Sequence, residues 1–151
     1  MDIRAFLAEH RVASIDEATQ TLSRSGPEHY RQGGEGPTRQ RLEALHDKLL
    51  EALARHDLGV MTAHGATIAG ERFHAGFGLS EVQIAFNVLE EVVWRRILSS
   101  VPPADFAEAI GSVSTLLGAG KDALALAYVN LASHARVESL DLSRLFRGTA
   151  G

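Results

Sequence analysis

The 151-residue sequence contains no cysteine, one tryptophan and four prolines, and it has no long apolar run. Without cysteine, disulfides and thiolate-based catalytic or metal sites are excluded. No run approaches the ~20 apolar residues that span a bilayer, and the N-terminal stretch MDIRAFLAEHRV carries charges too early for a signal peptide. The net charge of −4 provides no basic field for nucleic acid or an anionic membrane surface. We therefore expect a soluble cytoplasmic protein whose partners include neither nucleic acid nor membrane.

The dominant feature that is present is helical periodicity, which runs through almost every segment longer than ten residues, without an alternating strand pattern. The spacing predicts helices over 2–11, 14–25, 38–57, 58–75, 80–99 and 103–146, the last with a bend near 118–120. Residues 26–37 hold four glycines and two prolines, so they are predicted to form a flexible loop. A chain of this length fits one domain. We predict a single all-α bundle of about six to seven helices over residues 1–151, with no sheet.

The segment between the fourth and fifth predicted helices spells out a helix end, a corner and a new helix start. Ser80, with Gln83 three positions later, is typical of a capping box, in which each side chain binds an unpaired backbone N–H. Gly76 and Gly78 before it supply the backbone freedom of a corner. About three turns further back, Gly65 lies on the inward face of its helix, so another helix can approach closely there.

Two predicted helices carry more apolar surface than one core needs. On helix 80–99, Trp94 and Leu98 fall opposite the main apolar face. The last helix has two stripes on opposite sides: Leu124, Ala127, Tyr128, Leu131 and Ala135 in one, Leu126, Val129, Val137 and Leu140 in the other. A helix that is apolar on two sides is central in its own fold or shared with a partner. We predict a homodimer, with Trp94, Leu98, Leu126, Val129, Val137 and Leu140 at its interface. The sequence leaves open which stripe is core, and scattered surface residues are the alternative explanation.

The chemistry-bearing residues do not form a catalytic pattern, so no enzyme, no catalytic residue and no cofactor is predicted. The alternative is a cofactor-binding sensor. His46 and His56 lie on or near the apolar face of helix 38–57, where a haem ligand would sit, although a hydrogen-bonded core or rim histidine is the commoner case. The pairs Glu43-x-x-His46 and Glu71-x-x-His74 also match the di-iron pattern of helical bundles. Helical phase opposes that site, because Glu71 and His74 point away from the apolar face of their helix.

Arg72 is a charged residue whose helical phase turns it inward, between Ile68 and Phe73. A buried guanidinium is costly unless it is paired. We expect a structural ion pair, with Glu90, Glu91 or Asp122 as the carboxylate, and a small-molecule contact is the alternative.

Residues 65–82, GATIAGERFHAGFGLSEV, followed by a helix with Phe86, Leu89 and Val93 on its apolar face, resemble a known family: the RsbR/RsbRD-type N-terminal domain of the RsbT co-antagonist proteins, which are stressosome sensors. In that family a segment Arg-x-x-Gly-Phe-x-Leu-x-Glu opens the equivalent helix. Here Gly76 follows Arg72 by four positions rather than three, and Phe77, Leu79 and Glu81 then follow in register.

The resemblance implies a globin-like, all-helical fold that lacks haem, pairs as a dimer and serves as a sensory or protein-interaction module in stress signalling. Family members usually continue into a signalling domain, whereas this sequence ends at Gly151. We therefore expect it to act by binding a protein partner, or by sensing a small molecule and changing how it pairs.

Overall fold

A computed structural model describes the backbone of residues 1–149 and the side chains of residues 1–136. Over this range the chain forms seven α-helices and one 3-10 turn, and no strand. The elements are α1 (Ile3–Glu9), α2 (Arg11–Ser25), α3 (Glu28–Gly33), α4 (Glu35–Arg55), α5 (Gly59–His74), α6 (Leu79–Ser100), η1 (Pro103–Asp105) and α7 (Phe106–Thr149). The all-α class and the number of helices are confirmed. The globin-like arrangement stays a prediction.

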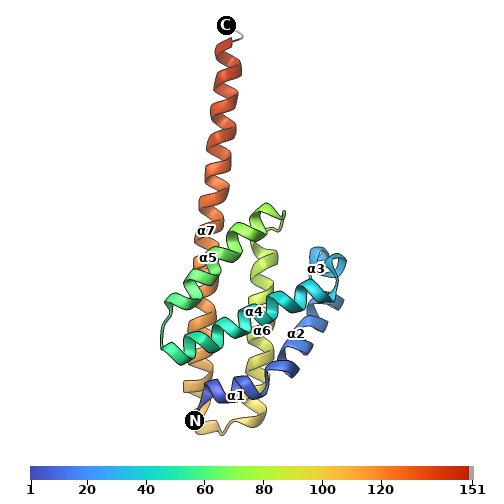
Figure 1. The fold of residues 1–151 in the computed structure, drawn as a ribbon, viewed down its shortest axis with the longest axis vertical. Helices are drawn as coiled ribbons and strands as arrows, with labels where there is room; N and C mark the ends of the chain where they lie inside the picture. The colour runs from blue at the N-terminus through green and yellow to red at the C-terminus, as the bar shows by residue number, and fades with distance from the viewer. Residues whose placement is uncertain (150–151) are drawn as a thin grey trace.

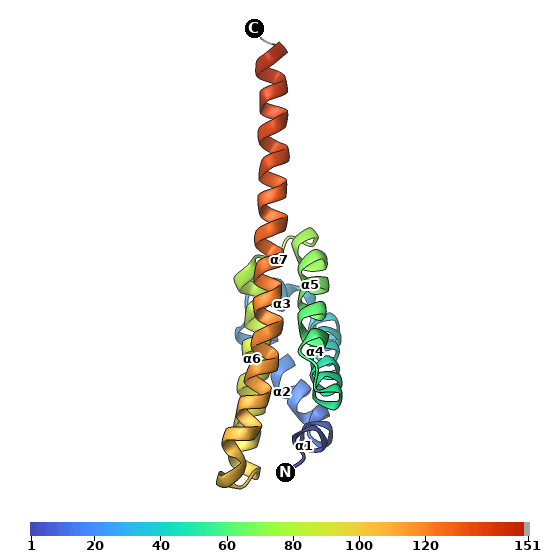
Figure 2. The ribbon, with the colours of Figure 1, turned by 90° about the vertical axis from the view of Figure 1, so that its left-hand side faces the viewer.

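The helices form a bundle in which α6 and α7 lie side by side and run in opposite directions (Figure 1). The turned view shows α4 and α5 on the opposite side from α6 (Figure 2). Helix α5 packs along α7, and α2 packs against both α4 and α6. The second half of α7 continues far beyond the other helices (Figures 1 and 2). One side of the α6–α7 pair therefore faces the core, and the projecting part of α7 stands apart from the bundle.

Two glycines allow close packing around α7: Gly65 of α5 lies against the α7 backbone, and Gly120 of α7 lies against Phe86 of α6. A methyl carbon added at Gly65 would lie 2.3 Å from the carbonyl oxygen of Gly120, and one added at Gly120 would lie 3.0 Å from the Phe86 ring. The close approach expected at Gly65 is thus confirmed. It also accounts for the unbroken course of α7, which has no bend at residues 118–120: the contact with α5 offsets the low helix propensity of glycine there.

The segment 26–37 differs from the expected flexible loop, because most of it is helical. Pro27 directly precedes α3, where its fixed φ and missing N–H cost little. The side chain of Tyr30 is buried and holds this short helix against the bundle. Gly34, at φ 84°, is the single residue that separates α3 from α4. The composition of the segment indicated turns correctly, but the burial of Tyr30 could not be read from it.

The α5–α6 corner is built differently from the predicted one. Helix α6 begins at Leu79, and Gly78 rather than Ser80 is its N-cap. The Glu81 carboxylate accepts the backbone N–H of Gly78 at 2.9 Å, and Phe77 N–H donates to the Arg72 carbonyl at 3.0 Å. The N–H of Gly78 and the His29 side chain lower the pKa of Glu81. The residues of the family-like segment therefore serve to close this corner.

Candidate functional site

Four apolar side chains are exposed on the two adjacent helices α6 and α7, in two groups: Trp94 and Leu98 on α6, and Leu126 and Val129 on α7. We refer to the two groups together as the α6–α7 face. The exposed fractions are 38% for Trp94, 53% for Leu98, 65% for Leu126 and 56% for Val129. On α7 the other stripe is the core one, since Leu124 and Tyr128 are buried, although Ala135 at its end is exposed. Val137 and Leu140 lie outside the residues whose side chains the structure describes.

A polar seam joins α6 to α7 beside this face. The Trp94 indole N–H donates to the Ser114 hydroxyl at 3.2 Å, and that hydroxyl donates to Glu90 at 3.0 Å. Lys121 donates to the Asn87 side chain at 2.7 Å. The indole is therefore held at the edge of the α6–α7 face, with its ring partly open to solvent.

Arg72 on α5 is turned inward, as its phase indicated, and its side chain is 15% exposed. Its nearest carboxylate is Glu71, with 3.9 Å between the Arg72 Nη2 and Glu71 Oε2 atoms, a distance beyond hydrogen bonding. Arg72 Nη1 is buried without a hydrogen-bond partner among the described residues. The three expected partners, Glu90, Glu91 and Asp122, do not pair with Arg72. Glu90 instead accepts a hydrogen bond from Ser114 in the polar seam.

A second arginine, Arg41 on α4, lies beside Arg72. The two guanidinium carbons lie over the same ring, that of Phe77, at 5.1 Å for Arg41 and 5.3 Å for Arg72 from its centroid. Burial lowers the pKa of Arg41, and the like charge of Arg72 lowers it further. Tyr30 packs edge-on against the Phe77 ring, and burial raises the pKa of Tyr30 to about 12. Two cations thus share a half-buried aromatic site next to a protonated hydroxyl.

Arg41, Arg72 and Tyr30 line a cavity of about 80 Å³ between α3, α4, α5 and α6. Its lining consists of Tyr30, Arg41, Leu42, Ala44, Leu45, Ile68, Glu71, Arg72, Val82, Ala85 and Phe86. The walls are mostly apolar, and the charged groups gather where α4 faces α5. The corner next to the cavity is tied to α7, because the Tyr128 hydroxyl donates to the Phe77 carbonyl at 3.0 Å.

Sequence reasoning found Arg72 but missed Arg41, Tyr30 and Phe77 as its neighbours. Arg41 has a weak signal, since it lies four positions before the buried Leu45 and so borders the apolar face of α4. Tyr30 has none, because its segment reads as a loop.

His46 on α4 is fully buried, and neither ring nitrogen has a hydrogen-bond partner among the described residues. Burial lowers its pKa from 6.5 to about 4; the positive charge of Arg11 adds to this effect, and Asp47 opposes it. The imidazole is therefore neutral at physiological pH. Buried core histidines are more often hydrogen-bonded, whereas His46 has no hydrogen bond to the described residues.

The buried imidazole should make stability depend on pH. Between pH 6.5 and 4 the unfolded chain binds a proton at His46 that the folded chain does not, so stability falls as the pH falls through this window and is unaffected by this group above it. Urea unfolding at pH 7 and pH 5 measures the effect. We expect the wild type to lose about 2 kcal/mol more than His46→Leu over this interval. His134→Gln, at an exposed position, should behave as the wild type. Equal losses in wild type and His46→Leu would contradict the assignment.

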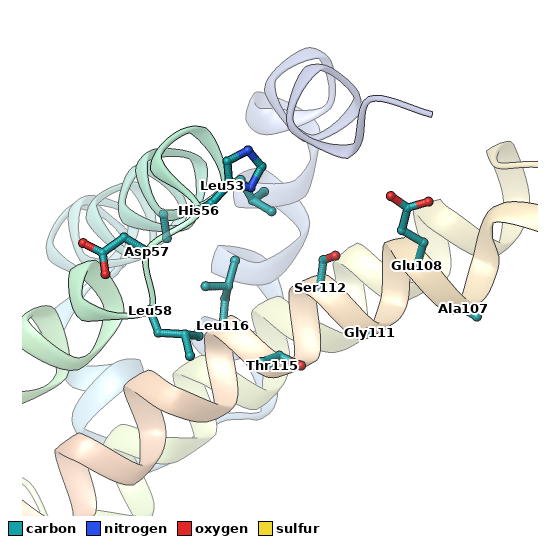
Figure 3. A pocket seen from close by; sticks show the side chains of 11 residues that line it. Leu53, His56, Asp57, Leu58, Ala107, Glu108, Gly111, Ser112, Thr115 and Leu116 are labelled. Atoms are coloured by element: carbon teal, nitrogen blue, oxygen red, sulfur yellow. The ribbon is translucent and has the colours of Figure 1, made fainter.

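His56 lies in quite different surroundings, at the end of α4 with φ 52°. It borders an open groove of about 480 Å³ between the α4–α5 corner and the start of α7 (Figure 3). His46 does not line this groove, so the two histidines named for a cofactor do not face a common space there. In the described part of the chain, no three histidine, aspartate or glutamate side chains gather as a metal site requires.

Together, these observations describe an all-helical domain with exposed apolar residues on its last two helices and an inward pair of arginines. The chain belongs to the RsbT co-antagonist family: the family model described as "RsbT co-antagonist protein rsbRD N-terminal domain" matches residues 12–141. This is a regulatory family of stress signalling rather than an enzyme family. Comparison with curated proteins and with solved structures gives no significant match. None of the described helices is both long and apolar enough to cross a membrane.

Proposed function

We propose that the protein is a non-catalytic regulatory module that pairs with a second copy of itself through the α6–α7 face and signals to a protein partner. The observation that carries the proposal is the outward stripe of α7, where Leu126 and Val129 are more than half exposed. An apolar stripe opposite the buried side of a helix is typical of a helix shared with a partner. Trp94 and Leu98 on α6 extend the same apolar character to the neighbouring helix.

The length of α7 supports a second copy as the partner. Past Leu131 the described side chains of α7 are exposed, and no other described helix lies beside its projecting half (Figure 1). A lone helix is marginally stable in water, because most helical stability in proteins comes from packing. Two copies related by a two-fold axis would place one α7 along the other and cover both at once.

The family membership gives the pairing its regulatory meaning. A signal or partner protein that binds one arrangement of the two α7 helices more tightly than another shifts the population between them. The signal is then passed on as a change in the surface of the paired α7 helices to which a partner protein binds.

Light scattering coupled to size-exclusion chromatography tests the pairing directly. At tens of micromolar we expect twice the mass of the 16.3 kDa chain. A mass equal to one chain throughout this concentration range would contradict the proposal.

A further inference from the structure

We propose that the cavity between α3, α4, α5 and α6 is a binding site for a small organic monocarboxylate, held by Arg41 and Arg72. The cavity lies inside one chain, so the inference does not depend on the pairing proposed above. The sequence allows a small-molecule contact as one explanation for the inward Arg72, and this proposal names the class of that molecule.

The charged side chains that line the cavity carry one more positive charge than negative charges. Two guanidinium groups line it, and the one carboxylate among its lining residues is Glu71. Glu71 is 59% exposed and lies 3.9 Å from Arg72, so it compensates the buried charge only weakly. Arg41 forms no ion pair with any described carboxylate, and Arg72 Nη1 has no partner among the described residues. A single added negative charge would balance the set, and it would relieve the cost of keeping the Arg72 guanidinium away from water with one nitrogen unpartnered.

The geometry of the two arginines suits a carboxylate. A guanidinium group presents parallel N–H donors that match the two oxygens of a carboxylate. The Phe77 ring lies within cation–π distance of both groups and restrains them from one side. Tyr30 of α3 lines the same cavity, and because burial raises its pKa to about 12, its hydroxyl stays protonated and can donate.

Size and polarity select among anions. The cavity of about 80 Å³ exceeds several times the ~10–15 Å³ that one water requires, but it excludes a ligand as large as a nucleotide. Its remaining walls include Leu42, Leu45, Ile68, Val82 and Phe86. The several acceptor oxygens of a phosphate would face these apolar side chains without partners, at a cost for each. A carboxylate with a short apolar body places its oxygens on the arginines and its carbons on the walls.

Thermal unfolding of the full chain at pH 7, with sodium propionate as the probe and sodium chloride keeping ionic strength constant, tests the site. A ligand that binds only the folded state raises Tm, and at ten times Kd the expected rise for a chain of this size is about 3–5 °C. Chloride and inorganic phosphate at equal ionic strength should give no comparable rise. A propionate effect no larger than that of chloride would overturn the proposal.

Variants separate the cavity from a general charge effect. Arg72→Gln and Arg41→Gln should each weaken propionate binding at least tenfold, as measured by calorimetry. Arg55→Gln removes a 65% exposed arginine of α4 and should leave the Kd unchanged. Glu71→Gln removes the competing carboxylate at an exposed position, so it should tighten binding several-fold even if an arginine variant fails to fold. Weakened binding in Glu71→Gln, or equal losses in Arg55→Gln and Arg41→Gln, would overturn the site. A monomer that binds propionate would contradict the pairing alone. A dimer that does not bind propionate would contradict the cavity proposal alone.

Discussion

Val129→Glu is expected to halve the mass of the protein in solution while its helices stay folded. Val129 is 56% exposed on the outer stripe of α7, so a charge there meets water in the single chain and costs the fold little. In a symmetric pair the same position meets the partner's apolar stripe, where a charge loses its hydration without gaining an opposite charge. Light scattering at concentrations where the wild type is paired measures the mass, and circular dichroism checks the helix content.

Val12→Glu is the matched control, because it makes the same chemical change at a similarly exposed valine on α2. Val12 is 66% exposed and lies outside the α6–α7 face. The Val12 variant should keep the mass of the wild type. If Val129→Glu left the mass unchanged, or if both variants halved it, the α6–α7 face would not be the interface.

Gly65→Ala is expected to destabilise the fold by about 3 kcal/mol or more, near or above the upper end of what overpacking usually costs. The added methyl carbon would lie 2.3 Å from the Gly120 carbonyl oxygen, and this contact is with backbone, which no side-chain rotation relieves. Helices α5 and α7 would have to separate along their shared contact. Urea unfolding measures the loss, which corresponds to a drop in Tm on the order of 10 °C for a chain of this size.

Gly70→Ala on the same helix provides the comparison. A methyl carbon at Gly70 meets no atom within 4 Å. Since alanine favours the helix over glycine by up to ~1 kcal/mol, this variant should be as stable as the wild type or more stable. Opposite signs for the two substitutions would confirm that close backbone packing is the reason for glycine at position 65. A loss in both would instead indicate a need for backbone freedom in α5.

The helices were predictable from sequence because their signals are local. Apolar residues three and four positions apart mark one face of a helix whatever surrounds it, and the order and class of the helices follow. The exact ends were less predictable. Both Gly78 and Ser80 are acceptable N-caps. The helix begins after Gly78, whose backbone N–H donates a hydrogen bond to Glu81. Segment 26–37 was misread for a related reason: a short helix held by one buried tyrosine has no periodic pattern.

The candidate site was half predictable. The phase of Arg72 indicated burial, because direction around a helix is fixed by spacing along it. Its neighbours lie on other elements, and no local pattern relates Arg41 or Tyr30 to it across more than thirty positions of chain. The same limit made all three carboxylates suggested for Arg72 wrong.

The sequence by itself determined that the chain is helical, that its last helices carry two apolar stripes and that one arginine turns inward. Each of these depends on residues within a few turns of one another. Only the tertiary structure decided which stripe of α7 is core, that Gly65 meets Gly120, and that Arg41 and Arg72 share the Phe77 ring. These depend on how separate helices pack, and many packings satisfy the same local periodicity until side chains of different helices come into contact.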